Sequence, residues 1–139
     1  MNISFINGCF DLLHPGHLLL LEQPKYDFPD IPLFVAINSD ASIRKLKGKG
    51  RPLIDELQRK RMLEALSCVD EVLTFDELNC VNVLRVLEPR WWYKGASYKG
   101  KIDPEEERVA ELLGTEVVYV KEIERFSTTK LLDKIKEVC

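Results

Sequence analysis

The chain of 139 residues lacks several features that would assign it to other protein classes. No apolar stretch approaches the roughly 20 residues that span a bilayer, so we expect no membrane segment. The chain begins with a strand pattern rather than a signal peptide, which favours a cytoplasmic location. Linkers, repeats and low-complexity tracts are missing, so we expect one domain over residues 1–139.

Positive charge is not in excess either. The formal net charge is −3, which argues against a general nucleic-acid surface. Basic residues nevertheless concentrate in two groups, which are Arg44, Lys45, Lys47, Lys49 and Arg51, and then Arg59, Lys60 and Arg61. Such groups form either a solvated face or a clamp for triphosphate or sugar phosphate, and we favour the clamp.

Cysteines are few, and they form no CxxC pair and no zinc spacing. We expect Cys9, Cys68, Cys80 and Cys139 to be reduced thiols. Cys9 lies in a glycine turn, where a neighbouring positive field would lower its pKa. No GxGxxG follows the first strand, which argues against a dinucleotide-binding dehydrogenase. No carboxylate cluster suggests a metal cage built by the protein alone.

Apolar runs, caps and turn residues predict alternating strands and helices. We expect strands near residues 2–7, 33–37, 70–75, 91–93 and 116–120. We expect helices from Pro15 to about Glu22, where Gln23-Pro24 ends the first, and then over 41–46, 55–66, 76–87, 104–113 and 128–138. Such alternation is typical of a parallel sheet with right-handed crossovers.

In such a sheet, ligands bind beyond the carboxyl ends of the strands, where the strand order reverses. The loops 8–17, 38–40, 94–98 and 125–129 each follow a predicted strand. We therefore expect their polar side chains to gather at one edge of the sheet.

Both histidines of the chain lie in the segment from Gly8 to His17, which reads GCFDLLHPGH. Pro15 suits the first helical position, which places His14 at or beside the N-cap and His17 in the first turn. Free backbone N–H groups and the positive helix end there attract phosphate. The two histidines either have a catalytic role or only cap and pack the start of the helix, and we favour the catalytic role.

His14-Pro15-Gly16-His17 resembles the HxGH signature of the nucleotidyltransferase superfamily, and GCFDLLHPGH resembles its cytidylyltransferase-like branch. VAINSD, LKGKGRPL, ELQRKRMLEAL and VDEV look like successive blocks of the heptose-phosphate adenylyltransferases within that branch. The resemblance implies a Rossmann-like α/β domain with strand order 3-2-1-4-5 and helices on both faces. It also implies nucleotidyl transfer to a sugar phosphate, with Mg²⁺ carried by the triphosphate.

The resemblance and the loop positions together give a set of candidate site residues. We expect catalytic roles for His14, His17, Lys47 and Arg59, nucleotide binding by Gly8, Cys9, Phe10, Asp11, Gly16, Lys94, Gly95, Ser127, Thr128 and Thr129, and acceptor binding by Asn38, Asp40, Lys47 and Arg51. Three of these roles have alternatives. Phe10 either covers the nucleotide or packs beneath the loop, and Arg59 holds phosphate or is an exposed helix charge. Ser127 is an N-cap as well as a phosphate ligand.

The chain departs from the family pattern at two positions. Many relatives have an aspartate where Ser97 stands, and glycerol-3-phosphate cytidylyltransferases have an arginine where Glu122 stands. The Glu122 departure weakens a glycerol-phosphate assignment, and the resemblance of GCFD, VAINSD, LKGKGRP and KGxSY to heptose-phosphate adenylyltransferases favours ATP and heptose 1-phosphate over CTP and glycerol 3-phosphate. The alternative of another class is a non-catalytic nucleotide-binding module. The family commonly forms homodimers, and Trp91-Trp92 suits either an interface or the core.

Overall fold

Five parallel strands form one sheet in the order β3-β2-β1-β4-β5, which confirms the predicted topology. The computed structural model describes residues 2–123 and 125–139. The strands are β1 (Ser4–Gly8), β2 (Leu33–Asn38), β3 (Glu71–Phe75), β4 (Trp91–Gly95) and β5 (Glu116–Val120). Because β1 pairs with both β2 and β4, the strand order reverses beside β1.

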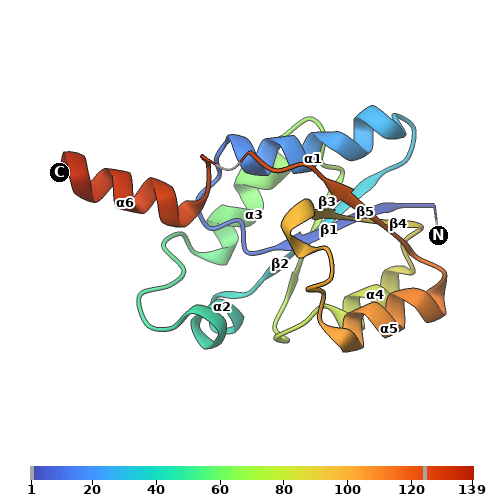
Figure 1. Ribbon diagram of the computed structural model, residues 1–139. Coiled ribbons are helices and arrows are strands. Elements are labelled where there is room, and N and C mark those ends of the chain that lie inside the picture. Colours follow the sequence, from blue (N-terminus) through green and yellow to red (C-terminus); the bar gives the residue numbers. More distant parts are fainter. Residues whose placement is uncertain (1, 124) are drawn as a thin grey trace.

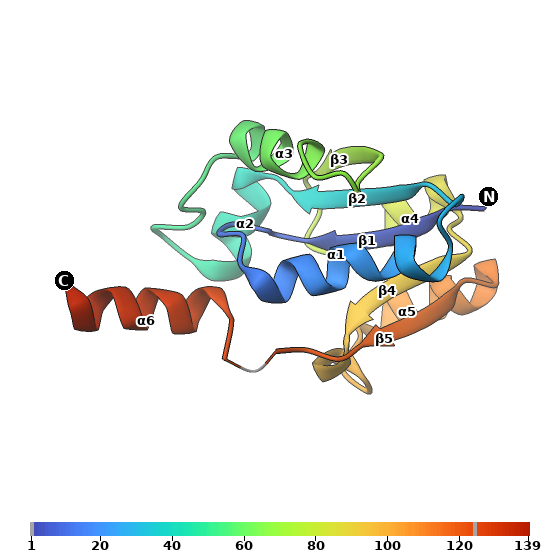
Figure 2. The ribbon, with the colours of Figure 1, turned by 90° about the horizontal axis from the view of Figure 1, so that it is seen from above.

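Helices cover both faces of this sheet (Figure 1). They are α1 (Pro15–Asp27), α2 (Asp40–Lys47), α3 (Glu56–Glu64), α4 (Val81–Leu87), α5 (Pro104–Leu113) and α6 (Thr128–Val138), with a short 3-10 turn at Ala96–Tyr98. Helices α1 and α3 lie over one face, and α4 and α5 lie over the other. Helix α6 extends away from the sheet (Figure 2).

Alternation along the strands divides the core into two layers. Phe5 and Trp92 face α4 and α5, whereas Ile6 and Tyr93 on the same strands face α1 and α3. Trp92 is fully buried, so the structure places it in the core rather than at a surface. Its neighbour Trp91 stacks on Phe28, with ring centroids 4.0 Å apart.

Two predicted boundaries are wrong. Helix α1 does not end at Gln23-Pro24 but continues to Asp27, with Pro24 buried inside it. Packing against the sheet offsets the hydrogen bond that Pro24 cannot donate. Helix α4 begins at Val81 rather than 76. Residues 77–80 form bends, and the Cys80 N–H donates to the Glu106 side chain.

Side-chain caps begin four of the other helices. Ser39, Asp55, Asp103 and Ser127 accept hydrogen bonds from the first turns of their helices, and Gly114 ends α5 in the left-handed region. All four cysteines are free thiols. Within the described residues, none of the helices has both the length and the apolar character needed to cross a bilayer.

Candidate active site

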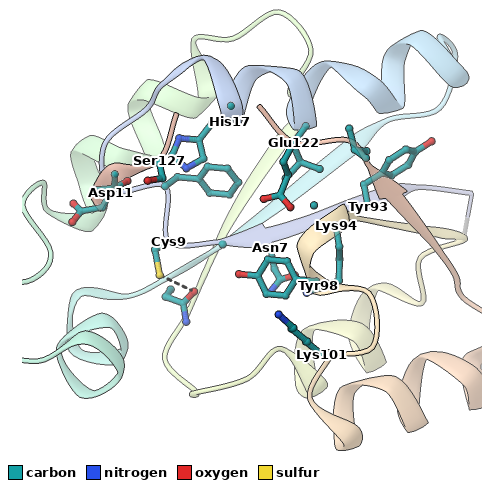
Figure 3. Close-up of a pocket in the computed structure, with 18 of the residues that line it drawn as sticks. Asn7, Cys9, Asp11, His17, Tyr93, Lys94, Tyr98, Lys101, Glu122 and Ser127 are labelled. Atoms are coloured by element: carbon teal, nitrogen blue, oxygen red, sulfur yellow. Dashed lines mark hydrogen bonds between the residues drawn. The ribbon is translucent and has the colours of Figure 1, made fainter. Parts of the chain in front are cut away.

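A cavity of about 730 Å³ lies at the carboxyl ends of the strands, where the strand order reverses (Figure 3). It brings together fourteen of the predicted site residues from segments far apart in the sequence. These are Gly8, Cys9, Phe10, Asp11, His14, Gly16, His17, Asn38, Lys47, Lys94, Gly95, Ser127, Thr128 and Thr129. Only Asp40, Arg51 and Arg59 of the predicted set do not line it.

The two imidazoles stack on each other at the start of α1, with ring centroids 3.7 Å apart. His14 is the N-cap and Pro15 the first helical residue, as predicted. His14 Nδ1 accepts the Gly16 N–H at 3.1 Å, and His17 Nδ1 accepts the His14 N–H at 3.2 Å. The capping interaction that serine and glutamate usually make is thus made here by two histidines.

These hydrogen bonds fix the tautomer of both rings. An Nδ1 atom that accepts a backbone N–H cannot carry a proton, so each neutral ring carries its proton on Nε2. Burial, then the neighbouring His14 and Lys47, lowers the pKa of His17 to about 4. Burial also lowers the pKa of His14. Near neutral pH the site therefore presents two uncharged N–H donors beside the positive end of α1.

Close packing holds these rings in place. A Cβ on Gly16 would meet the His14 ring at 2.9 Å, so only glycine leaves room for that ring. Phe10 is buried and packs against His17 with ring centroids 5.1 Å apart. Of the two alternatives for Phe10, the structure supports packing beneath the loop. A Cβ on Gly8 would meet the Phe10 ring at 2.9 Å.

The expectation for the Cys9 thiol is wrong. Burial raises the pKa of Cys9, and the charges of Lys47 and Arg59 do not outweigh that effect. Cys9 Sγ lies 3.7 Å from the Asn38 side-chain oxygen, to which it donates. Cys9 is therefore a protonated thiol in the cavity wall.

Asp11 lines the cavity, but its carboxylate is bonded to backbone N–H groups of another loop. Its carboxylate accepts from Leu53 N and Ile54 N, each at 2.9 Å. Arg51 lies 3.5 Å away from the same carboxylate. Asp11 thus ties the loop after α2 to the loop after β1, and its oxygens are occupied before any ligand arrives.

Arg59 is neither a phosphate ligand nor an exposed charge. Its side chain is fully buried and donates to the carbonyl oxygens of Ile54, Cys9 and Asn38 at 2.8 Å each. It also pairs with Asp40 at 2.9 Å. Arg59 therefore holds the loops that follow β1 and β2, and we correct its predicted catalytic role to a positioning role.

The predicted acceptor contacts of Asp40 and Arg51 are also corrected. Both residues line a separate, open surface hollow near Asp55, outside the main cavity. Asp40 is occupied by Arg59, and Arg51 faces Asp11. Lys47 at the end of α2 does line the main cavity, so Lys47 reaches the place expected for the predicted clamp and Arg51 does not.

Much of the opposite wall of the cavity consists of residues that were not predicted from the sequence. Polar residues there include Asn7, Lys101, Asp103, Glu106 and Glu122 (Figure 3 labels Asn7, Lys101 and Glu122), whereas Tyr98 lies in the predicted loop 94–98. Asn7 ends a strand next to the predicted loop, so the strand-end rule could have found it. Asp103 and Glu106 read locally as a helix cap and an acidic first turn, which hides their place in the cavity.

Glu122 reaches back from the end of β5 to the end of β4. Its carboxylate accepts the Ser97 N–H at 2.6 Å. A Cβ on Gly95 would lie 2.7 Å from this carboxyl group, so a larger residue there would displace the end of the Glu122 side chain. A carboxylate thus does reach the turn at Ser97, but it comes from Glu122 on another segment.

The start of α6 completes the cavity from a third direction. Ser127 caps the helix by accepting the Lys130 N–H at 3.0 Å, and Thr128 and Thr129 follow along the cavity wall. Two helix N-termini, those of α1 and α6, therefore face one cavity. Backbone N–H groups and helix dipoles at both make this end suitable for an anion.

The described residues contain no group of three histidine, cysteine, aspartate or glutamate side chains that could hold a metal ion. The side chains of His14, His17, Lys47 and the start of α6 are imidazoles, an ammonium and hydroxyls, which do not form a cage for a hard cation.

Comparison with known proteins places these features in a family. The family described as cytidylyltransferase-like matches residues 5–136. The protein named bifunctional protein HldE from Geobacter metallireducens is 43% identical over 135 residues, which cover 96% of this chain and 26% of the relative. The HldE protein of Koribacter versatilis is 45% identical, over 95% of this chain and 26% of that protein. The chain thus spans about a quarter of the length of these relatives.

Solved structures share the fold at lower identity. A lipopolysaccharide core biosynthesis protein from Thermoplasma volcanium superposes with a TM-score of 0.70 at 23% identity, over 87% of this chain and 98% of that one. Pantothenate synthetase from Thermus thermophilus superposes with a TM-score of 0.61 at 16% identity, over 88% of this chain and 56% of that one.

Proposed function

The chain belongs to the cytidylyltransferase-like family, a family of nucleotidyltransferases, and from that premise we propose the reaction that it catalyses. It transfers the nucleoside monophosphate of a nucleoside triphosphate to a sugar phosphate and releases pyrophosphate. We propose ATP as the donor and heptose 1-phosphate as the acceptor. The observation that carries this proposal is the stacked pair His14 and His17, whose Nε2–H groups are fixed as donors in the cavity.

In this reaction an oxygen of the acceptor phosphate attacks the α-phosphorus in line. A new P–O bond forms as the bond to the bridging oxygen breaks, and pyrophosphate leaves with that electron pair. The protein needs no nucleophile of its own, but it must align two anions and stabilise the charge on phosphorus. The Nε2–H groups of His14 and His17 donate to phosphate oxygens, and Lys47 and the start of α6 bind the rest of the triphosphate.

Mg²⁺ belongs to the proposal as a companion of the triphosphate. Because the phosphate-facing side chains do not form a metal cage, the ion would be bound by phosphate oxygens, and we assign no step to an ion held by the protein. We further propose that the protein works as a homodimer in the cytoplasm, the compartment in which nucleoside triphosphates are available.

A pyrophosphate-release assay tests the proposal. ATP and CTP are each combined with heptose 1-phosphate and with glycerol 3-phosphate. We expect ATP with heptose 1-phosphate to react fastest. Glu122 stands where glycerol-3-phosphate cytidylyltransferases have an arginine, so we expect CTP with glycerol 3-phosphate to react poorly. Nucleotide binding without pyrophosphate release in any combination would support a non-catalytic binding module instead.

A further inference from the structure

The two positions at which the sequence departs from the family pattern lie in contact with each other. Ser97 stands where many relatives have an aspartate, and Glu122 stands where glycerol-3-phosphate cytidylyltransferases have an arginine. In the structure the Glu122 Oε1 atom accepts the Ser97 N–H at 2.6 Å, across 25 residues of sequence. The two departures are therefore parts of one interaction, which joins the segment after β5 to the turn after β4.

This hydrogen bond connects the turn to the rest of the domain. The 3-10 turn Ala96–Tyr98 also accepts backbone N–H groups from residues 99 and 101, which follow it directly. Among the described residues, the bond from Ser97 to Glu122 is the only hydrogen bond between this turn and a distant segment. Residues 96–100 are exposed, so little packing would hold the turn in place without that bond.

The bond depends on the acidic side chain at position 122. Short N–H···O bonds to a carboxylate are roughly twice as strong as those between neutral groups. The carboxyl group also lies against the backbone of Gly95, where a Cβ would come within 2.7 Å of it. An arginine at position 122 could not make the bond, because a guanidinium group has no acceptor atom.

The turn that Glu122 holds forms one wall of the cavity. Lys94, Gly95 and Tyr98 line the cavity on both sides of the bonded N–H in the sequence. Glu122 lines it too, and Figure 3 shows its carboxyl group pointing inward. The Lys94 ammonium lies 4.6 Å from the centre of the Tyr98 ring, so the backbone of the turn sets how these two side chains meet. A shift of the turn would therefore change the wall that a ligand contacts.

We propose that Glu122 is a positioning residue, which holds residues 95–98 in the conformation that receives the nucleoside triphosphate. This inference rests on the proposed function, and it agrees with the expectation that Lys94 and Gly95 contact the nucleotide. A preorganised wall lowers the entropic cost of binding. Because Glu122 acts through the turn and not on the reacting phosphates, loss of the bond should weaken triphosphate binding and leave the chemical step unchanged.

Three variants separate the reach of this side chain from its charge. Glu122→Ala removes the acceptor, Glu122→Asp keeps the charge on a side chain one methylene shorter, and Glu122→Gln keeps an oxygen at the same reach without the charge. Loss of a hydrogen bond to a charged group should raise the KM for ATP about tenfold in the alanine and aspartate variants. In the glutamine variant we expect a rise of about threefold or less, because a neutral acceptor still bonds the Ser97 N–H.

The acceptor and the chemical step provide the comparison within each variant. The KM for heptose 1-phosphate and kcat should both stay within about twofold of the unmodified protein. Glu116→Ala makes the same truncation at an exposed position at the start of β5, outside the cavity, and should change none of these values. Calorimetric titration with ATP and with CTP, without acceptor, measures nucleotide binding independently of turnover and should rank the variants in the same order.

The other outcomes each contradict a defined part of the argument. Unchanged nucleotide binding in Glu122→Ala, or a rise in the KM for heptose 1-phosphate alone, would overturn the positioning role. Equal losses in the glutamine and alanine variants would overturn it too, because the charge and not the bond to the turn would then matter. If Glu122→Ala does not fold, the comparison of Glu122→Asp with Glu122→Gln decides.

Failure of the proposed function is recognised separately. An unmodified protein that binds nucleotide but releases no pyrophosphate would overturn the proposed reaction, while the titrations would still test the role of Glu122. An unmodified protein that binds neither ATP nor CTP would overturn both.

Discussion

At the scale of single residues, the site depends on which nitrogen of each imidazole carries the proton. His14 and His17 use their Nδ1 atoms to cap α1, so the residues that start the helix are also the donors of the site. Helix capping and phosphate binding usually compete for side-chain groups. An imidazole has two nitrogens, and it can therefore do both at once.

We predict that His17→Ala lowers turnover by a factor of about 10²–10³, the usual cost of removing one fixed donor to a developing charge. Leu18→Ala, a truncation of the next residue on α1 that does not line the cavity, should leave turnover unchanged. Pyrophosphate release measures both variants, and circular dichroism checks that α1 persists. Turnover within threefold of the unmodified protein in His17→Ala would remove His17 from the reaction.

The low pKa of His17 predicts how stability depends on pH. His17 titrates near 4 in the folded chain and near 6.5 when unfolded. Between these values the unfolded chain binds a proton that the folded chain does not, so the free energy of unfolding falls on acidification and this contribution is fully lost below about pH 4.

Urea unfolding at pH 7.5 and pH 5 measures this effect. We expect the unmodified protein to lose about 1 kcal/mol more than His17→Asn over this interval, a value discounted for the partial solvation of the ring. Asparagine keeps an acceptor for the His14 N–H and removes the titration. Equal losses in the two proteins would mean that His17 is not held neutral by the fold.

At the scale of secondary-structure elements, Arg59 is the connection that assembles the cavity. From α3 it binds carbonyl oxygens of the loops after β1 and β2 and pairs with Asp40 at the start of α2. Asp11 adds a second connection, from the loop after β1 to residues 53–54. These buried polar contacts fix loops whose own backbone would otherwise be free to move.

We predict that Arg59→Met lowers the free energy of unfolding by about 3 kcal/mol or more, because it leaves Asp40 and three carbonyl oxygens without their donor. Arg61→Met makes the same change at an exposed position on α3, where about 0.5 kcal/mol or less is expected. Urea denaturation at neutral pH measures both. Similar losses for the two variants would show that the Arg59 contacts contribute nothing beyond those of a surface arginine.

At the scale of the whole molecule, no other element among the described residues packs against α6 along most of its length. It has no buried residue, and Ile135 and Val138 on one side of it are 49% and 79% exposed. Both ribbon views show the helix standing off the sheet (Figures 1 and 2). An amphipathic helix gains stability mainly by burying its apolar side. A second copy of the chain would supply that burial, in agreement with the proposed homodimer.

We predict that sedimentation velocity finds a particle of twice the chain's mass, and that Ile135→Asp combined with Val138→Asp shifts it to the monomer. Burying two carboxylates in an apolar interface costs several kcal/mol, enough to dissociate it. Glu137→Lys changes the charge on the other side of α6 and should leave the dimer intact. A monomer in the unmodified protein, or a dimer in the double variant, would refute an interface through α6.

The sequence by itself determined those features that depend on neighbours in the chain. Local patterns account for the strands that begin at Ser4 and Leu33. They also account for the helix starts that are capped by His14, Ser39, Asp55 and Ser127. Parallel pairing then requires the loops after the strands to meet at one edge, so most of the site could also be predicted.

The tertiary structure alone decided which charged side chains face the cavity. Arg59 and Arg61 carry the same local signals, yet one is buried against carbonyl oxygens up to 50 residues away in the sequence and the other is exposed. Glu106 and Glu107 in the first turn of α5 differ in the same way, because Glu106 is buried and Glu107 is exposed. The energy of a charge depends on the dielectric and the partners around it, and distant segments supply both.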